Sequence, residues 1–182
     1  MYIISKNAED QAVINAACEL CAVIRTAPKA CGIDHLETAI IIGEDKDSLA
    51  AEMRKFGSYS KDEFFIRDAG NVDASFAVVL VGAKYETRGL GSRCRLCGFE
   101  DCETCRTNKA VCVFTPLDLG IAIGSAVAKA ADMRLDNRIM FTIGKAAAAL
   151  GLLGEHSLIM GIPLAVAGKS PFYDRNDKSA AT

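Results

Sequence analysis

Apolar and polar positions alternate at helical spacing near the start of the chain. The apolar positions are Val13, Ala17, Leu20, Cys21 and Ile24. Polar side chains occupy the opposite face, so the pattern predicts an amphipathic helix over residues 7–24, with Asn7 able to cap its first turn. Pro28 disfavours helical backbone at the preceding residue and should end the helix.

Residues 36–42 predict a strand, and the apolar run of residues 75–81 predicts a second strand that is buried. Between them, residues 45–56 form an amphipathic helical pattern that Gly57 closes. Residues 62–73 are ambiguous, and we expect them to be helical only in part.

The second half of the chain contains a clear helix start. Thr115 is suited to the N-cap and Pro116 to the first helical position. A second helix is expected over residues 144–153 and a strand over residues 158–166, where Pro163 predicts an edge or bulged position.

Small residues recur along the helix that follows Pro116, at Gly120, Gly124 and Ala128. Such a row lets another backbone approach closely. Packing in the core is the favoured interpretation, and contact with a second subunit or a cofactor is the alternative. The length predicts one domain spanning residues 1–182.

Composition narrows the classes of function. The chain has 182 residues, 51% of them hydrophobic, a mean hydropathy of +0.19, a net charge of −2 and a pI of about 5.7. No basic run is present, which argues against nucleic acid as a partner. Charged residues and prolines interrupt the most apolar region, so no membrane span is expected.

Cysteine is the residue type with the most uneven distribution. Five of the eight cysteines lie in residues 94–112, spaced C-x2-C-x4-C-x2-C-x6-C. The segment around them, residues 83–114, is polar and bears glycines, and we interpret it as an insertion between two core elements. The chain opens without a secretory leader pattern, so we expect a reducing cytoplasm and a metal or iron–sulfur site instead of disulfides.

The spacing favours a [4Fe–4S] cluster over structural zinc, because only four residues separate the two C-x2-C pairs. Gly98 allows the backbone to turn tightly around a cluster. The fourth ligand is either Cys105 or Cys112, and Cys112 is preferred because a helix start follows it. The first three ligands would be Cys94, Cys97 and Cys102.

Three further cysteines lie near the start of the chain. Cys18 and Cys21 form a C-x2-C inside the first helix, and Cys31 follows the helix end. Because a full ligand set is lacking nearby, we interpret the pair as small core residues.

Residues 94–102 and 118–126 resemble the prokaryotic proteins described as uncharacterised and containing a ferredoxin domain. The likeness includes residues 25–30, 161–164 and 168–175. The resemblance implies Cys105 as an extra thiol and the following cluster ligands: Cys94, Cys97, Cys102 and Cys112.

The order of several segments is also similar to that of the FMN-dependent nitroreductases. These are Ala27-Pro28, the strand entry at 73–80, the helix from Asp118, and a late Gly-Ile-Pro strand. The resemblance implies an α+β fold, with a nitroreductase-like sheet flanked by helices, in a homodimer that holds FMN at its interface. By position, Arg175 or Lys169 would meet the FMN phosphate. The Arg-x-Ser-x-Arg phosphate motif of that family and its flavin-contacting Asn are missing here.

Two hypotheses of function follow. The first is an oxidoreductase in which an inserted [4Fe–4S] cluster exchanges electrons with FMN or with a small redox donor or acceptor. The second is a cluster-binding electron carrier or sensor that lacks flavin and catalyses no reaction.

Overall fold

The computed structural model describes residues 2–154 and 157–173. Its helices are α1 (Ser5–Thr26), α2 (Gly43–Ser60), α3 (Glu63–Asp73), α4 (Cys102–Thr107), α5 (Phe114–Asp132) and α6 (Phe141–Ala149). Its strands are β1 (Leu36–Ile42), β2 (Ala77–Lys84), β3 (Asp136–Asn137) and β4 (Ser157–Ala165). Short 3₁₀ turns occupy Ala30–Gly32 and Gly91–Arg93. In the part of the chain that is described, no helix is long and apolar enough to cross a membrane.

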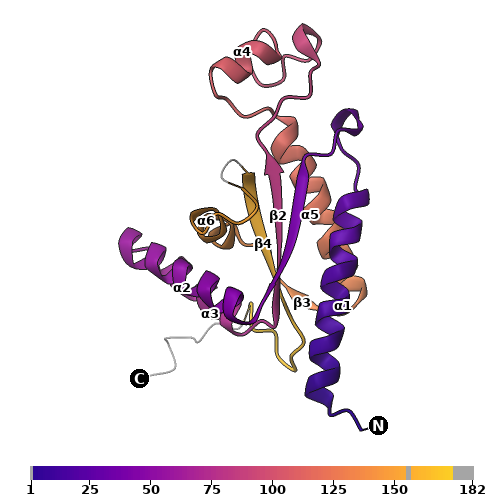
Figure 1. The fold of residues 1–182 in the computed structure, drawn as a ribbon, viewed down its shortest axis with the longest axis vertical. Coiled ribbons are helices and arrows are strands. Elements are labelled where there is room, and N and C mark those ends of the chain that lie inside the picture. Colours follow the sequence, from indigo (N-terminus) through magenta and orange to yellow (C-terminus); the bar gives the residue numbers. More distant parts are fainter. Residues whose placement is uncertain (1, 155–156, 174–182) are drawn as a thin grey trace.

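The strands form one antiparallel sheet in the order β1-β2-β4-β3. Helices α1 and α5 cover one face of the sheet, and α2, α3 and α6 cover the other (Figure 1). The fold is therefore α+β, with a sheet flanked by helices on both faces, as expected from the sequence.

The central strand β2 supplies side chains to two separate cores, because alternate residues of a strand point to opposite faces. Towards α1 and α5 it buries Ala77, Val79, Val81 and Ala83. Towards α2, α3 and α6 it buries Val78 and Leu80. An element buried on both faces needs an unbroken apolar run, which is the pattern that β2 has.

Strand β1 begins and ends where the sequence predicts, but two helices begin without the caps that the sequence predicts. The first helix starts at Ser5, two residues before the predicted cap Asn7, and has no side-chain cap. The prediction of Thr115 as an N-cap is also wrong. Helix α5 begins at Phe114, and the fully buried Thr115 donates its hydroxyl proton to the carbonyl oxygen of Glu86 at 3.5 Å.

Two other predictions need correction. The ambiguous stretch is helical almost throughout, as α3. The strand that contains Pro163 lies inside the sheet between β2 and β3, where Pro163 faces Val78. Its β3 side is paired only at Leu164 and Ala165 and through a bridge at Gly161, so the proline lies where that pairing is interrupted.

The turn after α1 is held by two cations of the 25–30 segment. Lys29 donates from its ammonium group to the carbonyl oxygens of Ile24 and Arg25 at the C-terminal end of the helix. Cations near unpaired helix carbonyls are stabilising. Arg25 in turn pairs with Asp34 and donates to Leu36 O at 3.1 Å. This segment therefore has a structural role: it joins α1 to β1.

The row of small residues on α5 does not pack in the core of this chain. Gly120, Gly124 and Ala128 are exposed, and a Cβ added at either glycine would meet nothing within 4 Å. Leu117 and Ile121 lie exposed on the same helix. The favoured interpretation of core packing is therefore wrong.

Candidate metal centre

The cysteine-rich segment between β2 and α5, residues 85–113, projects beyond the end of the sheet (Figure 1); we call it the cysteine loop. It has almost no core of its own. From Gly89 to Val111 the only buried residue is Cys105. A segment of this size without apolar burial needs another source of stability, such as a bound metal or cluster.

The first two cysteines flank a tight turn. The amide of Gly98 donates to Arg95 O at 3.1 Å, and both residues have positive φ, +80° for Gly98 and 55° for Arg95. The left-handed conformation suits glycine. The turn places Cys94 and Cys97 on the same side of the loop, where both line one hollow.

The next two cysteines lie on the short helix α4. Asp101 caps this helix: its carboxylate accepts from the amide and the hydroxyl of Thr104, both at 2.8 Å. These bonds favour the ionised form and lower the pKa of Asp101. The cap therefore fixes Cys102, at the first helical position, and Cys105 one turn later.

Four cysteines line the hollow beneath the loop: Cys94, Cys97, Cys102 and Cys112. Cys112 is tied to the body of the protein, since its carbonyl oxygen accepts from the amide of Thr115 at 2.9 Å at the start of α5. These are the four residues predicted as ligands. Which of them bind a metal remains a prediction.

Cys105 differs from those four. It is completely buried, does not line the hollow, and its thiol lies 3.6 Å from Ala110 O. Burial is the main cause that raises the pKa of Cys105 to about 11, and a hydrogen bond with the neighbouring thiol of Cys97 contributes to the same shift. Its buried position outside the lining of the hollow suits a packing role better than that of a ligand.

A buried ion pair lies at the base of the hollow. Arg88 also lines the hollow, and its guanidinium donates to Asp118 Oδ2 at 2.8 and 3.2 Å and to Glu86 O at 2.8 Å. The two charged side chains are only 1% and 2% exposed. The other oxygen of Asp118 accepts from the amide of Ala30 at 3.0 Å. The pair thus joins the cysteine loop, α5 and the turn after α1.

Sequence analysis did not identify this pair. Arg88 and Asp118 are 30 residues apart, and neither belongs to a charged motif. The available signal was an aspartate in the first turns of a helix whose neighbours are almost entirely apolar, which indicates a buried carboxylate that needs a partner.

The donors around the hollow are almost entirely thiols. Thiolates select zinc, copper(I) and iron–sulfur clusters, and no histidine or carboxylate lines the hollow apart from Asp101, which is engaged as a cap. Among the described residues, no three His, Cys, Asp or Glu side chains already stand at metal-binding distances. The cysteines therefore surround the hollow without forming a closed ligand shell.

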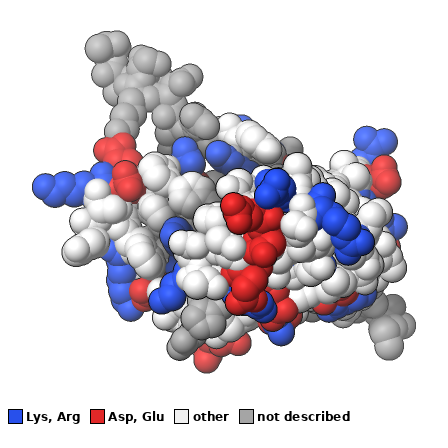
Figure 2. Space-filling model, turned by 90° about the horizontal axis from the view of Figure 1, so that it is seen from above, with Lys and Arg blue, Asp and Glu red and all other residues white. Residues whose placement is uncertain are grey.

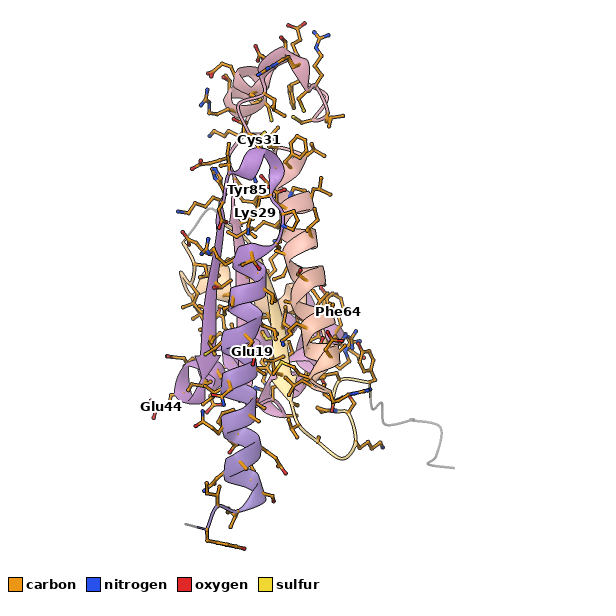
Figure 3. The ribbon with its side chains drawn as sticks, turned by 90° about the vertical axis from the view of Figure 1, so that its right-hand side faces the viewer. Glu19, Lys29, Cys31, Glu44, Phe64 and Tyr85 are labelled. Atoms are coloured by element: carbon orange, nitrogen blue, oxygen red, sulfur yellow. The ribbon has the colours of Figure 1, made fainter. Side chains whose placement is uncertain are left out.

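The other candidate residues lie elsewhere. Cys18 and Cys31 are exposed and Cys21 is half-buried, so the prediction of small core residues is wrong for Cys18. Figure 3 shows Cys31 in the turn just below the cysteine loop. Lys169 is exposed, and Arg175 lies outside the described residues.

The end of the molecule that carries the loop has charges of both signs. Figure 2 looks onto this end and shows basic and acidic side chains side by side. Within the loop, Arg106 pairs with Glu103, and Arg95 donates to the carbonyl oxygen of Glu100. The described part of this face therefore carries charges of both signs.

The fold is similar to that of several solved nitroreductases. One is the FMN-dependent nitroreductase NfnB from Mycobacterium smegmatis in complex with NADPH, with a TM-score of 0.59, 11% identity, and coverage of 92% of this chain and 86% of that one. Another is a nitroreductase with bound FMN from Desulfitobacterium hafniense, with a TM-score of 0.58 and 13% identity, and coverage of 92% of this chain and 85% of that one. A third is CinD from Lactococcus lactis in complex with nicotinic acid, with a TM-score of 0.54 and 16% identity, and coverage of 100% of this chain and 88% of that one.

Sequence comparison is more specific. The family model described as "uncharacterized protein containing a ferredoxin domain" matches residues 108–175, which include Cys112 but not the four preceding cysteines. A protein of Archaeoglobus fulgidus, described as uncharacterized, is 39% identical over 186 residues, covering 98% of this chain and all of that protein. The chain therefore belongs to the family of uncharacterized proteins containing a ferredoxin domain, and it has the fold of the nitroreductases.

Proposed function

We propose that this protein is an iron–sulfur redox protein that holds a [4Fe–4S] cluster in the cysteine loop. The ligands in this proposal are Cys94, Cys97, Cys102 and Cys112. One observation carries it: a loop without a core of its own gathers four thiol side chains around one hollow. The description of the family as containing a ferredoxin domain supports the same class of cofactor.

Such a cluster supplies one-electron transfer when bound. The chain's own residues have distinct tasks. Arg88 lines the hollow, and its ion pair with the buried carboxylate of Asp118 ties the cysteine loop to α5. Asp118 holds the guanidinium of Arg88 in place, and the hydrogen bond from the backbone amide of Thr115 to the carbonyl oxygen of Cys112 holds Cys112. The loop thus orients the ligands, and the body anchors one side of them.

Metal analysis after anaerobic purification tests the proposal. We expect a brown protein with about four iron and four sulfide per chain, because thiolates at this spacing favour cubane clusters. One equivalent of zinc without sulfide, in the same anaerobic preparation, would contradict it.

Serine substitutions distinguish the two candidates for the fourth ligand. We expect Cys112→Ser to lose most of the iron, because it removes a thiolate at the hollow. Cys105→Ser should retain the iron, because this thiol is buried outside the lining of the hollow. Iron and sulfide per chain are measured for both variants. Loss by Cys105→Ser with retention by Cys112→Ser would reverse the assignment.

Within this class, a flavin and iron–sulfur oxidoreductase is the candidate that the fold favours. NfnB is described as FMN-dependent, and the Desulfitobacterium hafniense structure contains FMN. The second candidate, a carrier or sensor without flavin, is supported by the missing phosphate and flavin motifs near Ala27-Pro28. A visible spectrum separates the two, because flavin adds bands to the broad absorption of the cluster.

For the flavin candidate we predict a role for Arg175. Arg175→Ala should weaken FMN binding by about 1.5–3 kcal/mol, the range for a hydrogen bond to a charged group, since a guanidinium suits phosphate oxygens. Lys169→Ala is the companion variant for the alternative residue. Titration of the cluster-loaded protein with FMN measures both. Equal affinity in parent and both variants would exclude these two residues as the phosphate site.

We also propose a homodimer formed through the exposed face of α5, where Gly120 and Gly124 allow close approach. Ile121, 41% exposed on this face, provides the test. Ile121→Lys should raise the dimer dissociation constant about 30-fold, the effect of losing about 2 kcal/mol at an interface. Ile66→Lys, at a site 43% exposed on α3, is the matched control and should leave the dimer intact. Light scattering at several concentrations measures the mass, and a monomeric parent would exclude the dimer.

All eight cysteines are free thiols in the structure. Free thiols and an oxygen-sensitive cluster are compatible with a reducing compartment, so we place the protein in the cytoplasm as part of this proposal.

A further inference from the structure

A wide groove lies on a second side of the cysteine loop. Its volume is about 1130 Å³, and its walls come from the end of β2, the residues that follow α4, and the turn after α6. Cys112 lines both this groove and the hollow that holds the other candidate ligands. A molecule bound in the groove would therefore lie next to one of the proposed cluster ligands.

The charges around the groove favour an anionic ligand. Three cations line it, Lys84, Arg106 and Lys109, against two carboxylates, Glu37 and Glu86. Both carboxylates already have a basic partner: Lys84 Nζ lies 2.7 Å from Glu37, and His35 Nδ1 lies 3.1 Å from Glu86.

Lys109 is the cation that this network leaves available. Arg106 pairs with Glu103, whereas none of the described residues forms an ion pair with Lys109. Lys109 is exposed and follows α4, where its φ of 52° places it in a left-handed turn. Its ammonium group can therefore pair with a ligand without breaking an existing ion pair.

The same groove exposes apolar surface. Tyr85 and Val111 line it and are 46% and 47% exposed. Figure 3 places Tyr85 at the base of the cysteine loop, of which it is the first residue. An exposed aromatic side chain offers a face for stacking with a flat ring. A groove that combines an apolar wall with an available cation suits a ligand that has both a ring and an acidic group.

We propose that the groove binds a planar aromatic anion, with its ring against Tyr85 and its acidic group at Lys109, beside Cys112. The binding itself does not require a cluster. A redox use of the groove rests on the function proposed above, because it is the bound cluster that would make Cys112 the electron-transfer neighbour of the ligand.

Calorimetric titration of the oxidised, cluster-loaded protein with anthraquinone-2-sulfonate tests this inference. We expect saturable binding of one molecule per chain. Lys109→Ala should raise the dissociation constant about tenfold, because it removes a charge-assisted bond. Tyr85→Ala should raise it about fivefold, because it removes a stacking surface.

Two matched controls exist on α2 and the residue that follows it. Lys61 is an exposed lysine that follows α2, and its φ is 59°. Tyr59 is an exposed tyrosine, and neither residue lines the groove. Lys61→Ala and Tyr59→Ala should bind the probe like the parent. The iron and sulfide content of every variant should equal that of the parent.

The outcomes are distinguishable. The groove inference alone is overturned if the cluster-loaded protein shows no saturable binding up to about 1 mM probe. A dissociation constant of that size corresponds to a binding free energy of only about 4 kcal/mol. Equal affinities of Lys109→Ala and Lys61→Ala overturn it as well. Binding with the predicted variant effects in a protein that carries no cluster after anaerobic purification supports the groove and contradicts the proposed function.

Discussion

Replacing Asp118 with asparagine is expected to lower the free energy of unfolding by about 3–5 kcal/mol, because it leaves a buried guanidinium without its counter-charge. The substitution keeps the shape of the side chain, so the loss reports on charge. Arg88 cannot recover its hydration at this site, since the pair is almost completely buried. Denaturant unfolding followed by circular dichroism measures the change.

A solvent-exposed ion pair between α1 and α5 provides the control. Glu19 on α1 lies 2.8 Å from Lys129 on α5, with both side chains in contact with solvent. Glu19→Gln should leave the stability almost unchanged, because exposed ion pairs contribute little. Figure 3 shows Glu19 on the outer surface of α1. A similar loss in both variants would mean that burial is not the cause.

A double substitution separates the ion pair from its surroundings. Arg88→Met combined with Asp118→Leu removes both charges and fills a similar volume, so it should regain most of the stability that Asp118→Asn loses. The amide of Ala30 would still lack its acceptor, which leaves a residual cost of about 1–3 kcal/mol. A double variant that is less stable than Asp118→Asn would contradict this account.

Replacing Gly144 with alanine is expected to destabilise the protein by about 3 kcal/mol, the upper part of the range for overpacking. A Cβ at this position would lie 1.8 Å from the carbonyl oxygen of Ile159, so α6 would have to move away from β4. Gly161 is equally restricted, since its Cβ would lie 2.1 Å from Ile143 Cγ2. Because the obstacle at Gly144 is backbone, a change of rotamer cannot relieve it.

Thermal unfolding measures this effect. The loss should lower Tm by about 6–12 °C for a chain of this size. Gly70 is the matched control. It lies in a helix, as Gly144 does, but it is exposed, and a Cβ there would meet nothing within 4 Å. Gly70→Ala should stabilise the protein by about 0.5–1 kcal/mol, since alanine is the better helix former. Equal Tm values for the two variants would show that α6 yields easily.

The sequence predicted the elements whose burial creates a periodic pattern. The β1 strand has the predicted bounds, and β2 follows from its unbroken apolar run. Helix starts were less predictable, because α1, α2 and α5 begin without side-chain caps. The two-residue strand β3 is too short to show any period.

The candidate site was predictable in its thiols and not in its supports. Cysteine spacing is a local property, so the cysteines that line the hollow could be named from the sequence. The pairing of Arg88 with Asp118 and the contact of Gly144 with β4 depend on residues that meet only after folding. Likewise, the face of α5 that carries Gly120 could be assigned to the surface only once the sheet was known to contact the other face.

The separation between the cysteine loop and the two cores has a consequence for biosynthesis. Both cores are built from residues outside the loop, and the loop connects to the body at the end of β2 and the start of α5. Under the function proposed above, the newly made polypeptide could therefore fold its body before any iron arrives. Loading of the cluster would then be a late maturation step on a folded scaffold.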